Sequence, residues 1–342
     1  MEQTDGAIAD FIASLPKAEL HVHLEGTLEP ELKFELAARN GLVLPYADVA
    51  AMKASYIYHD LPSFLTIFYE GSEVLLQEAD FRDLVYAYLR KAASQNVLYA
   101  EMFFDPQQHT DRGVSFATII EGLTRGRIEA ERDFGIVSQL IMCFVRERSA
   151  ESAMAVFEAS LPYKHLIVGV GLDSDEKGHP PVKFAEVFQR ARGYGYKLTM
   201  HCDVNQENTL VHIHQVLHTI GVDRIDHGVN ALEDMTLCET IRERGLGLTV
   251  CPVSNRFCVQ SLTADEIRKM LALGMRATVN SDDPAYFRAY MNENLEALHE
   301  EGGLTRDEII QLVRNAFEVA WLDQPRRDAY LQKVQTYVTN AQ

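Results

Sequence analysis

Glu19-Leu20-His21-Val22-His23-Leu24 is a strand-like run that contains two histidines separated by one residue. Residues i and i+2 of a strand point to the same face, so both imidazoles can approach one cation. Four later strand-like runs end on similar polar or reactive residues, namely His201, Ile225-Asp226-His227, Cys251-Pro252 and Ser281-Asp282-Asp283. Together, these run ends predict a metal site.

Short apolar runs alternate with helical patterns along most of the chain. The runs predict strands at 19–24, 97–104, 136–145, 165–172, 197–202, 224–227, 247–251 and 276–280. Apolar residues at three- and four-residue spacing predict helices between them, for example at 81–94, 116–132, 182–192 and 233–244. This alternation predicts an α/β fold of the (β/α)₈ TIM-barrel type, whose active site lies at the C-terminal ends of the strands.

Two segments extend the predicted barrel. Residues 30–76 are longer than one crossover needs, and we expect a helical insertion after the first strand that covers the barrel mouth. A plain pair of packing helices explains its aromatic residues equally well. These residues are Tyr56, Tyr58, Phe64, Phe68 and Tyr69. Residues 305–322 and 326–338 predict C-terminal helices that seal the barrel, and the absence of a linker predicts one barrel domain over 1–342.

The composition indicates the class of ligand. The chain has 50 acidic and 32 basic residues and a formal charge of -18, which disfavours nucleic acid and anionic membranes as partners. A small neutral or cationic molecule fits better. Five scattered cysteines indicate reduced thiols, and the N-terminal 20 residues resemble neither a signal peptide nor a membrane span. We therefore expect a cytoplasmic protein and leave formation of a homo-oligomer open.

Four residues at the predicted strand ends form a candidate metal-ligand set. His21, His23, His201 and Asp282 supply nitrogen and oxygen atoms suited to one Zn²⁺ ion and leave a coordination position for water. A lone His-x-His pair is weak support, because a strand can hold two histidines for structural hydrogen bonds. Zn²⁺ lowers the pKa of water to about 7 and thereby supplies hydroxide that can attack an electron-poor carbon.

Two further residues are candidates for the chemistry. We expect His227 to orient the hydroxide and to stabilise developing negative charge. Strand alternation should point Asp226 elsewhere. Asp283 is expected to accept a proton or a hydrogen bond from water or from a ring nitrogen of the ligand. N-capping of the helix that starts at Pro284 is an alternative role for Asp283, compatible with the first.

The remaining histidines and cysteines fit structural roles better. His212, His214 and His218 fall in a helical segment, where we expect solvated side chains. His109 follows the second strand and fits either the border of the pocket or a loop-stabilising role. Cys202 and Cys251 are expected to pack rather than to act as nucleophiles.

The segment Lys17-Ala18-Glu19-Leu20-His21-Val22-His23-Leu24-Glu25-Gly26-Thr27 resembles the opening motif of the adenosine and adenine deaminase family in the amidohydrolase superfamily. Four later segments resemble its later motifs in order: Gly169-Val170-Gly171-Leu172-Asp173, Ile225-Asp226-His227-Gly228, Cys251-Pro252-Val253-Ser254-Asn255 and Ser281-Asp282-Asp283-Pro284. Phe104-Asp105-Pro106-Gln107 and Asn280-Ser281-Asp282-Asp283-Pro284 are closest to the bacterial and fungal adenine deaminase branch. The resemblance covers nearly the whole chain.

This resemblance implies His21, His23, His201 and Asp282 as zinc ligands, His227 as the orienting base, and Asp283 as a substrate contact. Gly171, within the motif Gly169-Val170-Gly171-Leu172-Asp173, is a further expected substrate contact. The family continues after the third metal histidine as Ala-Gly-Glu, whose glutamate protonates the purine ring. Here Val204 occupies that position, and loss of a general acid costs about a hundred- to ten-thousand-fold in rate.

Three explanations of Val204 remain open. Asp203 or Glu207 takes over as acid, or the substrate has another ring or a better leaving group than ammonia, or the protein binds a metal and a ligand without catalysis. The main hypothesis is a zinc-dependent aminohydrolase that deaminates adenine or a related 6-substituted aminopurine. The alternatives are a divergent amidohydrolase that cleaves a C–N bond in another heterocycle or cyclic amide, and a non-catalytic binding protein.

Overall fold

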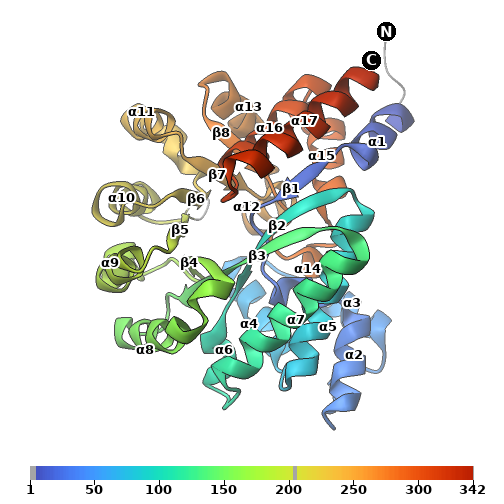
Figure 1. The fold of residues 1–342 in the computed structure, drawn as a ribbon, viewed down its shortest axis with the longest axis vertical. Coiled ribbons are helices and arrows are strands. Elements are labelled where there is room, and N and C mark those ends of the chain that lie inside the picture. Colours follow the sequence, from blue (N-terminus) through green and yellow to red (C-terminus); the bar gives the residue numbers. More distant parts are fainter. Residues whose placement is uncertain (1–4, 203–205, 342) are drawn as a thin grey trace.

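A computed structural model describes residues 5–202 and 206–341. In this part of the chain, eight strands form one parallel sheet in sequence order, and helices surround it (Figure 1). The strands are β1 (Lys17–Glu19), β2 (Val97–Phe104), β3 (Val137–Val145), β4 (Ile167–Asp173), β5 (Lys197–Cys202), β6 (Arg224–His227), β7 (Gly247–Val250) and β8 (Arg276–Val279). The predicted (β/α)₈ barrel is confirmed.

The first strand differs from its predicted extent. β1 begins at Lys17 and ends at Glu19, so His21 and His23 lie in the extended chain that follows it. This chain closes the barrel against the end of β8, because Asp282 N donates to His21 O at 3.1 Å and His23 N donates to Asp282 O at 2.9 Å. The two predicted metal-ligand segments are therefore held together by main-chain hydrogen bonds.

The barrel interior contains a buried ion pair beneath the strand ends. Arg224 of β6 donates to Glu101 of β2, and both side chains are fully buried. The Arg224 guanidinium lies 4.2 Å from the ring centroid of Trp321, whose main-chain N donates to Glu101 Oε1 at 2.6 Å. Trp321 lies in the connection between α16 (Arg306–Val319) and α17 (Gln324–Asn340), and it packs against Gly169 near the start of β4, at the barrel end opposite the predicted site. α16 itself packs along β8 and β1, and α17 packs on α16.

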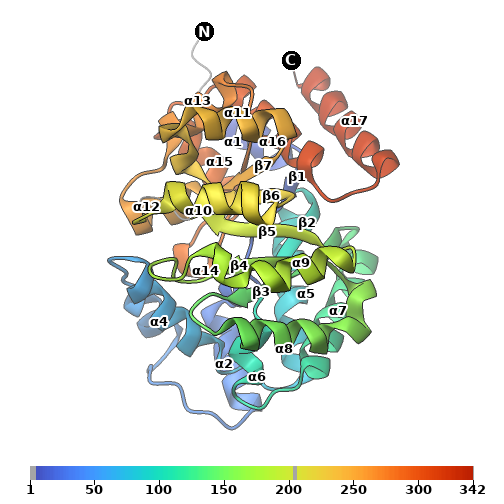
Figure 2. The ribbon, with the colours of Figure 1, turned by 90° about the vertical axis from the view of Figure 1, so that its left-hand side faces the viewer.

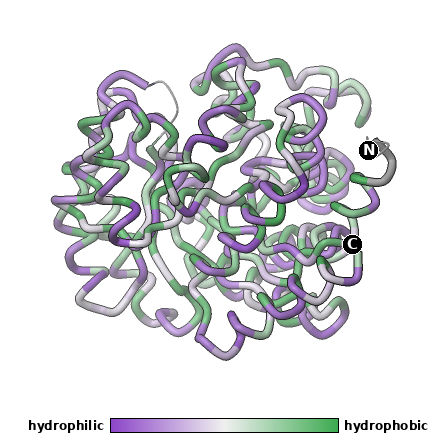
Figure 3. The backbone as a smooth tube through the Cα atoms, turned by 90° about the horizontal axis from the view of Figure 1, so that it is seen from above, coloured by the Kyte–Doolittle hydropathy of each residue, from purple (hydrophilic) through white to green (hydrophobic). Residues whose placement is uncertain are grey.

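The outer helices cover the strands. Eight of them are α5 (Glu78–Ser94), α7 (Phe116–Phe134), α8 (Ala150–Ser160), α9 (Ala185–Gly193), α10 (Thr209–Gln215), α11 (Met235–Arg244), α13 (Ala264–Ala272) and α15 (Met291–Glu300). Hydrophilic and hydrophobic residues alternate along the coils of the backbone (Figure 3), as expected of helices with one buried face. None of the described helices is long and apolar enough to cross a bilayer.

The insertion after β1 forms three helices: α2 (Pro30–Arg39), α3 (Val49–Ser55) and α4 (Leu61–Ser72). They lie on one side of the barrel (Figure 2), where they join α14 (Pro284–Phe287) in a second hydrophobic cluster. We call this cluster the aromatic cover; its buried members are Met52, Tyr56, Tyr58, Phe64, Leu65, Phe68, Val253, Ala285, Tyr286, Phe287 and Ala289. The insertion packs on itself and also reaches the barrel mouth.

A buried lysine joins the aromatic cover to α2. Lys33 is 1% exposed, and its Nζ donates to Tyr56 Oη at 2.8 Å and to Tyr286 Oη at 2.7 Å. Burial lowers the pKa of Lys33 to about 7, with Glu29 opposing the shift. The uncharged amine is therefore favoured in the folded protein at mildly alkaline pH.

We expect Lys33 to make stability depend on pH. Between pH 7 and 10.5 the unfolded chain binds a proton at Lys33 that the folded chain does not, so the free energy of unfolding rises with pH in this window and falls as the pH drops toward 7. Lys33→Met should remove a slope of about 1.4 kcal/mol per pH unit in urea unfolding measured between pH 7.5 and 9. Lys53→Met, at a partly exposed lysine of α3, is the control and should keep the slope.

Candidate active site

A cavity of about 290 Å³ opens at the C-terminal ends of the strands. Its floor contains His23, His201, His227, Asp282 and Asp283, and its outer wall contains apolar side chains of α4 and α14. The floor residues come from different strand ends, as the barrel geometry predicts.

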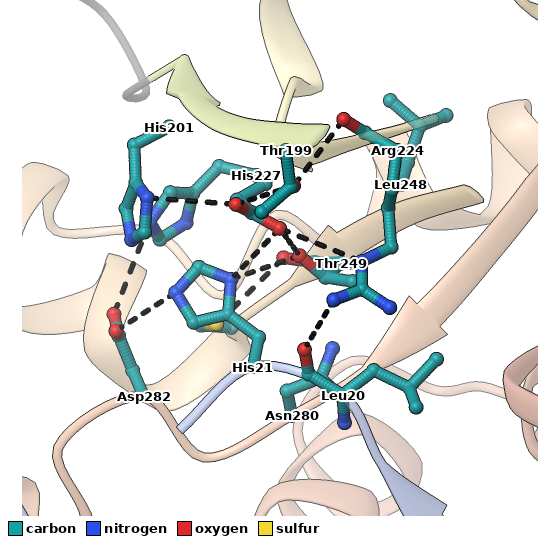
Figure 4. Close-up of polar contacts among 12 residues, drawn as sticks. Leu20, His21, Thr199, His201, Arg224, His227, Leu248, Thr249, Asn280 and Asp282 are labelled. Carbon is teal, nitrogen blue, oxygen red and sulfur yellow. Dashed lines mark hydrogen bonds and ion pairs between the residues drawn. The ribbon is translucent and has the colours of Figure 1, made fainter. Parts of the chain in front are cut away.

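The four predicted metal ligands lie together and are buried; His23, His201 and Asp282 are in the cavity floor, and His21 lies behind it. One ligand atom from each of His21, His23, His201 and Asp282 lies within 4.8 Å of the other three. His21 Nε2 is 3.1 Å from Asp282 Oδ1 (Figure 4). His23 Nε2 is 3.1 Å from His201 Nε2. His23 Nε2 is also 3.4 Å from Asp282 Oδ1. The structure therefore forms a His/Asp group that could hold a metal ion.

Hydrogen bonds to the outer ring nitrogens prepare these imidazoles for a cation. His201 Nδ1 lies 3.1 Å from the carbonyl oxygen of Leu172, which can only accept, so Nδ1 must carry the proton. Thr249 Oγ1 donates to Asp226 Oδ1 at 2.9 Å and therefore accepts from His21 Nδ1 at 2.8 Å. In both rings the Nε2 lone pair faces the cluster, and such outer contacts are typical of metal-ligating histidines.

Asp226 is part of this support. Asp226 Oδ2 accepts from Thr199 Oγ1 at 2.6 Å and lies 3.6 Å from His201 Nδ1. Asp226 Oδ1 lies 3.9 Å from His21 Nδ1. Asp226 therefore faces away from the cavity, as strand alternation predicts. Its carboxylate instead lies near the Nδ1 atoms of two candidate ligands, His21 and His201.

The charges of the cluster suit a divalent cation. Although burial opposes the shift, His21 and His23 hold the pKa of Asp282 well below its usual range. Burial and the neighbouring His21 lower the pKa of His201 well below its usual range. An ionised carboxylate and a neutral imidazole are the forms that bind metal. Although burial opposes the shift, Asp283 and Asp282 raise the pKa of His23 well above its usual range, so a metal ion would have to displace a proton there. The cluster therefore fits a metal ion by its geometry, by the tautomers of His21 and His201, and by the charges of His201 and Asp282.

His227 and Asp282 both adopt left-handed backbone conformations, with φ of 56° and 64°. Non-glycine residues in this region store strain and occur preferentially at functional sites. His227 Nε2 lies 4.0 Å from Asp282 Oδ2, so the imidazole faces the cluster across the cavity. Burial, with a further contribution from His21, lowers the pKa of His227 to about 4, which favours the neutral ring.

Asp283 lies beside the cluster at the start of α14. Its side chain makes no capping hydrogen bond to that helix, so the predicted capping role is not observed. Asp283 Oδ1 is buried and accepts no hydrogen bond from a described residue. Burial and the adjacent Asp282 raise the pKa of Asp283 well above its usual range. Gly26 is required opposite it, because a Cβ there would lie 2.0 Å from Asp283 Oδ1.

Two cavity residues were not among the predicted site residues. Asp105 follows β2 and Asp173 ends β4, and both line the cavity while being 1% and 2% exposed. Burial and the neighbouring Asp173 raise the pKa of Asp105 well above its usual range. Their position after a strand was a usable signal, because it is the same position that identified His201 and Asp282.

The structure places other predicted residues away from the cavity. A Cβ on Gly171 would point to Cys143 Sγ at 2.6 Å, and Gly171 does not line the cavity, whereas Ser174 does. Val204 and Asp203 lie outside the described residues. The Glu207 side chain is exposed and is not among the cavity-lining residues.

Two of the remaining histidines are buried in ion pairs. His212 Nδ1 lies 2.5 Å from Glu176 Oε1, which contradicts its predicted solvation, whereas His214 and His218 are exposed as predicted. The distant Glu176 reaches His212 from the loop after β4. His109 Nε2 lies 2.8 Å from Glu25 Oε1, so His109 has the structural role.

Comparison with known proteins identifies the family. The family profile described as adenosine deaminase matches residues 16–337 of this chain. The chain belongs to the adenosine deaminase family. The predicted family and enzyme class, a deaminase that acts on C–N bonds, are confirmed by this match and by the relatives.

Curated relatives of this family member match along nearly their whole length. An uncharacterized deaminase of Schizosaccharomyces pombe is 54% identical over 333 residues, covering 97% of this chain and 98% of the relative. The adenine deaminase of Hahella chejuensis is 46% identical, covering 97% of this chain and 99% of the relative. That of Caulobacter vibrioides is 47% identical, covering 97% and 96%.

Two solved structures share the architecture. The adenine deaminase of Arthrobacter aurescens superposes with a TM-score of 0.91 at 39% identity, over 95% of this chain and 100% of that chain. An amidohydrolase of Burkholderia ambifaria, solved with bound zinc, superposes with a TM-score of 0.88 at 28% identity, over 100% of this chain and 96% of that chain.

Proposed function

We propose that the protein is a zinc-dependent aminohydrolase that converts adenine, or a related 6-substituted aminopurine, to the corresponding oxopurine. The observation that carries the proposal is the convergence of three imidazole Nε2 atoms and one carboxylate at and just behind the cavity floor, with His227 and Asp283 beside them. The adenine deaminases among the relatives support adenine as the substrate.

His21, His23, His201 and Asp282 would hold one zinc ion. Zinc bound in such a site acidifies water and supplies hydroxide near neutral pH. Thr249, Leu172 and Asp226 keep His21 and His201 in the required tautomer and orientation. The reaction adds water to the carbon that carries the amine, breaks the C–N bond and releases ammonia.

His227 and Asp283 act on the reacting atoms. The neutral His227 ring accepts a proton from the attacking water and then carries positive charge beside the oxygen that becomes negative. Asp283 accepts a proton or a hydrogen bond from the attacking water or from a ring nitrogen of the substrate, and its Oδ1 is buried and receives no hydrogen bond from a described residue.

The other walls of the cavity suit a flat, uncharged heterocycle. Phe64, Leu65 and Phe68 of α4 and Phe287 of α14 provide apolar surface against a ring face. The polar lining includes six aspartates and one lysine, the rim residue Lys177. A phosphorylated nucleotide would therefore meet net repulsion in this cavity.

Val204 is the point at which this proposal is most readily tested by substitution. A glutamate at this position would provide a proton donor that valine lacks, so Val204→Glu should raise kcat/KM for adenine by about tenfold or more. Steady-state ammonia release is the measurement, and Val204→Gln, which adds a similar side chain without the acid, should give no gain. An unchanged rate for Val204→Glu would indicate that another group already supplies the proton.

Ammonia or amine release from a panel of compounds tests the proposal itself. Zinc-loaded protein would be incubated with adenine, other 6-substituted aminopurines, other amino-heterocycles and cyclic amides, with Asp282→Ala as the inactive control. Turnover of aminopurines supports the proposal. Turnover only of other rings would favour the divergent amidohydrolase. This alternative is retained because Val204 stands where the family has a glutamate proton donor. Ligand binding without turnover, unaffected by His227 substitution, would support a binding protein.

A further inference from the structure

Asp105 and Asp173 form a pair of buried carboxyl groups that the proposed mechanism does not use. One oxygen of each lies within 4.8 Å of the other and of a ring nitrogen of His23. Within the described residues, no protein N–H donates to either Asp173 oxygen or to Asp105 Oδ1. The two carboxyl groups interact with each other instead, and Asp173 also interacts with the Cys143 thiol. The second oxygen, Asp105 Oδ2, accepts from Gln108 Nε2. Both side chains line the cavity and are at least 98% buried.

Buried carboxyl oxygens without a donor carry a large desolvation cost, which a bound ligand can remove. The position of the two carboxyl groups indicates which part of a ligand would donate a hydrogen bond to them. His23 Nε2 faces His201 and Asp282, whereas His23 Nδ1 faces Asp173 Oδ2 at 3.5 Å. One imidazole ring therefore separates the metal-ligand cluster from the carboxyl pair, and a bicyclic purine can extend from the first to the second.

We propose that Asp105 and Asp173 accept a hydrogen bond from the imidazole-ring N–H of a free purine base and thereby select bases over N9-substituted purines. This inference rests on the proposed function, because it assumes that the amine-bearing carbon faces the cluster. The imidazole N–H is the only ring donor of adenine, and nucleosides lack it. A site that is built to pair with a substrate N–H strongly rejects an analogue without one, because its buried acceptors stay unpaired.

A second cation is a less suitable occupant of the same place. It would use His23 Nδ1 together with the two carboxylates, while His23 Nε2 faces the first cluster. Both nitrogens of one imidazole would then have to give up their protons, whereas a neutral ring keeps one. A ligand N–H leaves the protonation of His23 unchanged. It can donate to the Asp105 and Asp173 oxygens that receive no hydrogen bond from a protein N–H.

Calorimetric binding of purine and 9-methylpurine to the zinc-loaded protein tests the contact. Neither compound has an amine to lose, so binding is measured without turnover. We expect purine to bind about 10- to 100-fold more tightly than 9-methylpurine. Asp173→Asn should reduce this preference to less than about threefold. The carbonyl of the new amide would pair with His23 Nδ1, so its NH₂ group would face the ligand N–H.

Controls separate this contact from other effects. Asp175→Asn removes a charge from the partly exposed rim of the same loop and should keep the preference. Asparagine has the shape of aspartate, so a preference caused only by a clash with the methyl group would survive in Asp173→Asn. Bound zinc is measured in each variant, and Asp105→Asn provides a second test if Asp173→Asn does not fold.

Equal binding of the two ligands to the wild-type protein would overturn the inference, as would a preference that survives both substitutions. The expected pattern together with absent adenine turnover would support the N–H contact and contradict the proposed deamination. Adenine turnover at the same kcat/KM as 9-methyladenine would support deamination and contradict the contact. No binding of either purine and no turnover would overturn both.

Discussion

Asp282→Ala is expected to abolish zinc binding and deaminase activity together. Asp282 contributes the only carboxylate of the four-residue cluster, and its Oδ1 lies 3.1 Å from His21 Nε2 and 3.4 Å from His23 Nε2. Loss of the metal removes several kcal/mol of transition-state stabilisation, which corresponds to a decrease of about 1,000-fold or more in kcat/KM. Zinc content after dialysis and ammonia release from the preferred substrate measure the two effects.

Two further variants make this result specific. Alanine is strained at the φ of 64° that Asp282 adopts, so Asp282→Asn, which tolerates a left-handed backbone, separates loss of the charge from backbone strain. The Asp282→Asn variant should also bind zinc more weakly than the wild type. Asp283→Asn should keep zinc while activity falls, because Asp283 is not a proposed ligand. Full zinc content and full activity in Asp282→Ala would refute the ligand assignment.

His227→Asn is expected to lower kcat by about a hundred- to ten-thousand-fold while zinc stays bound. His227 faces the cluster across the cavity, but its Nε2 is 4.0 Å from Asp282 Oδ2 and is not one of the four proposed ligand atoms. Asparagine suits the φ of 56° at this position, so the backbone of the site should be preserved. Single-turnover rates and zinc content, measured on the same preparation, separate catalysis from metal binding.

His214→Asn is the matched control for this prediction. His214 is exposed on α10 and lies against His218, so its replacement should leave the rate unchanged. If His227→Asn retains activity within about threefold of the wild type, His227 is not the group that moves the proton.

The fold and the metal-ligand cluster could be predicted from sequence because their signals are local. Strands buried on both faces appear as short apolar runs, and parallel strands place their final residues at one end of a barrel. His201 and Asp282 were therefore identifiable from position alone. β1 was the exception, since Leu20 to Leu24 continues the apolar pattern of a strand while pairing only through isolated bridges to the ends of β2 and β8.

Features that depend on distant partners could not be predicted in this way. The burial of His212 depends on Glu176, which reaches it from another loop. The position of Asp226 beneath His21 and His201 depends on Thr199 and Thr249 from the two flanking strands. Asp105 and Asp173 follow strands, as the candidate ligands do. That no protein N–H donates to most of their oxygens could be recognised only from the structure around each oxygen.

The main-chain closure between His21–His23 and Asp282 has a consequence for biosynthesis. The proposed ligands His21 and Asp282 are 261 positions apart, so a chain emerging from the ribosome contains the first two histidines long before the carboxylate that completes their site. Under the proposed ligand assignment, the four-ligand site is complete only after the last strand has docked beside the first. Zinc would then act as a late checkpoint that preferentially retains chains whose barrel has closed.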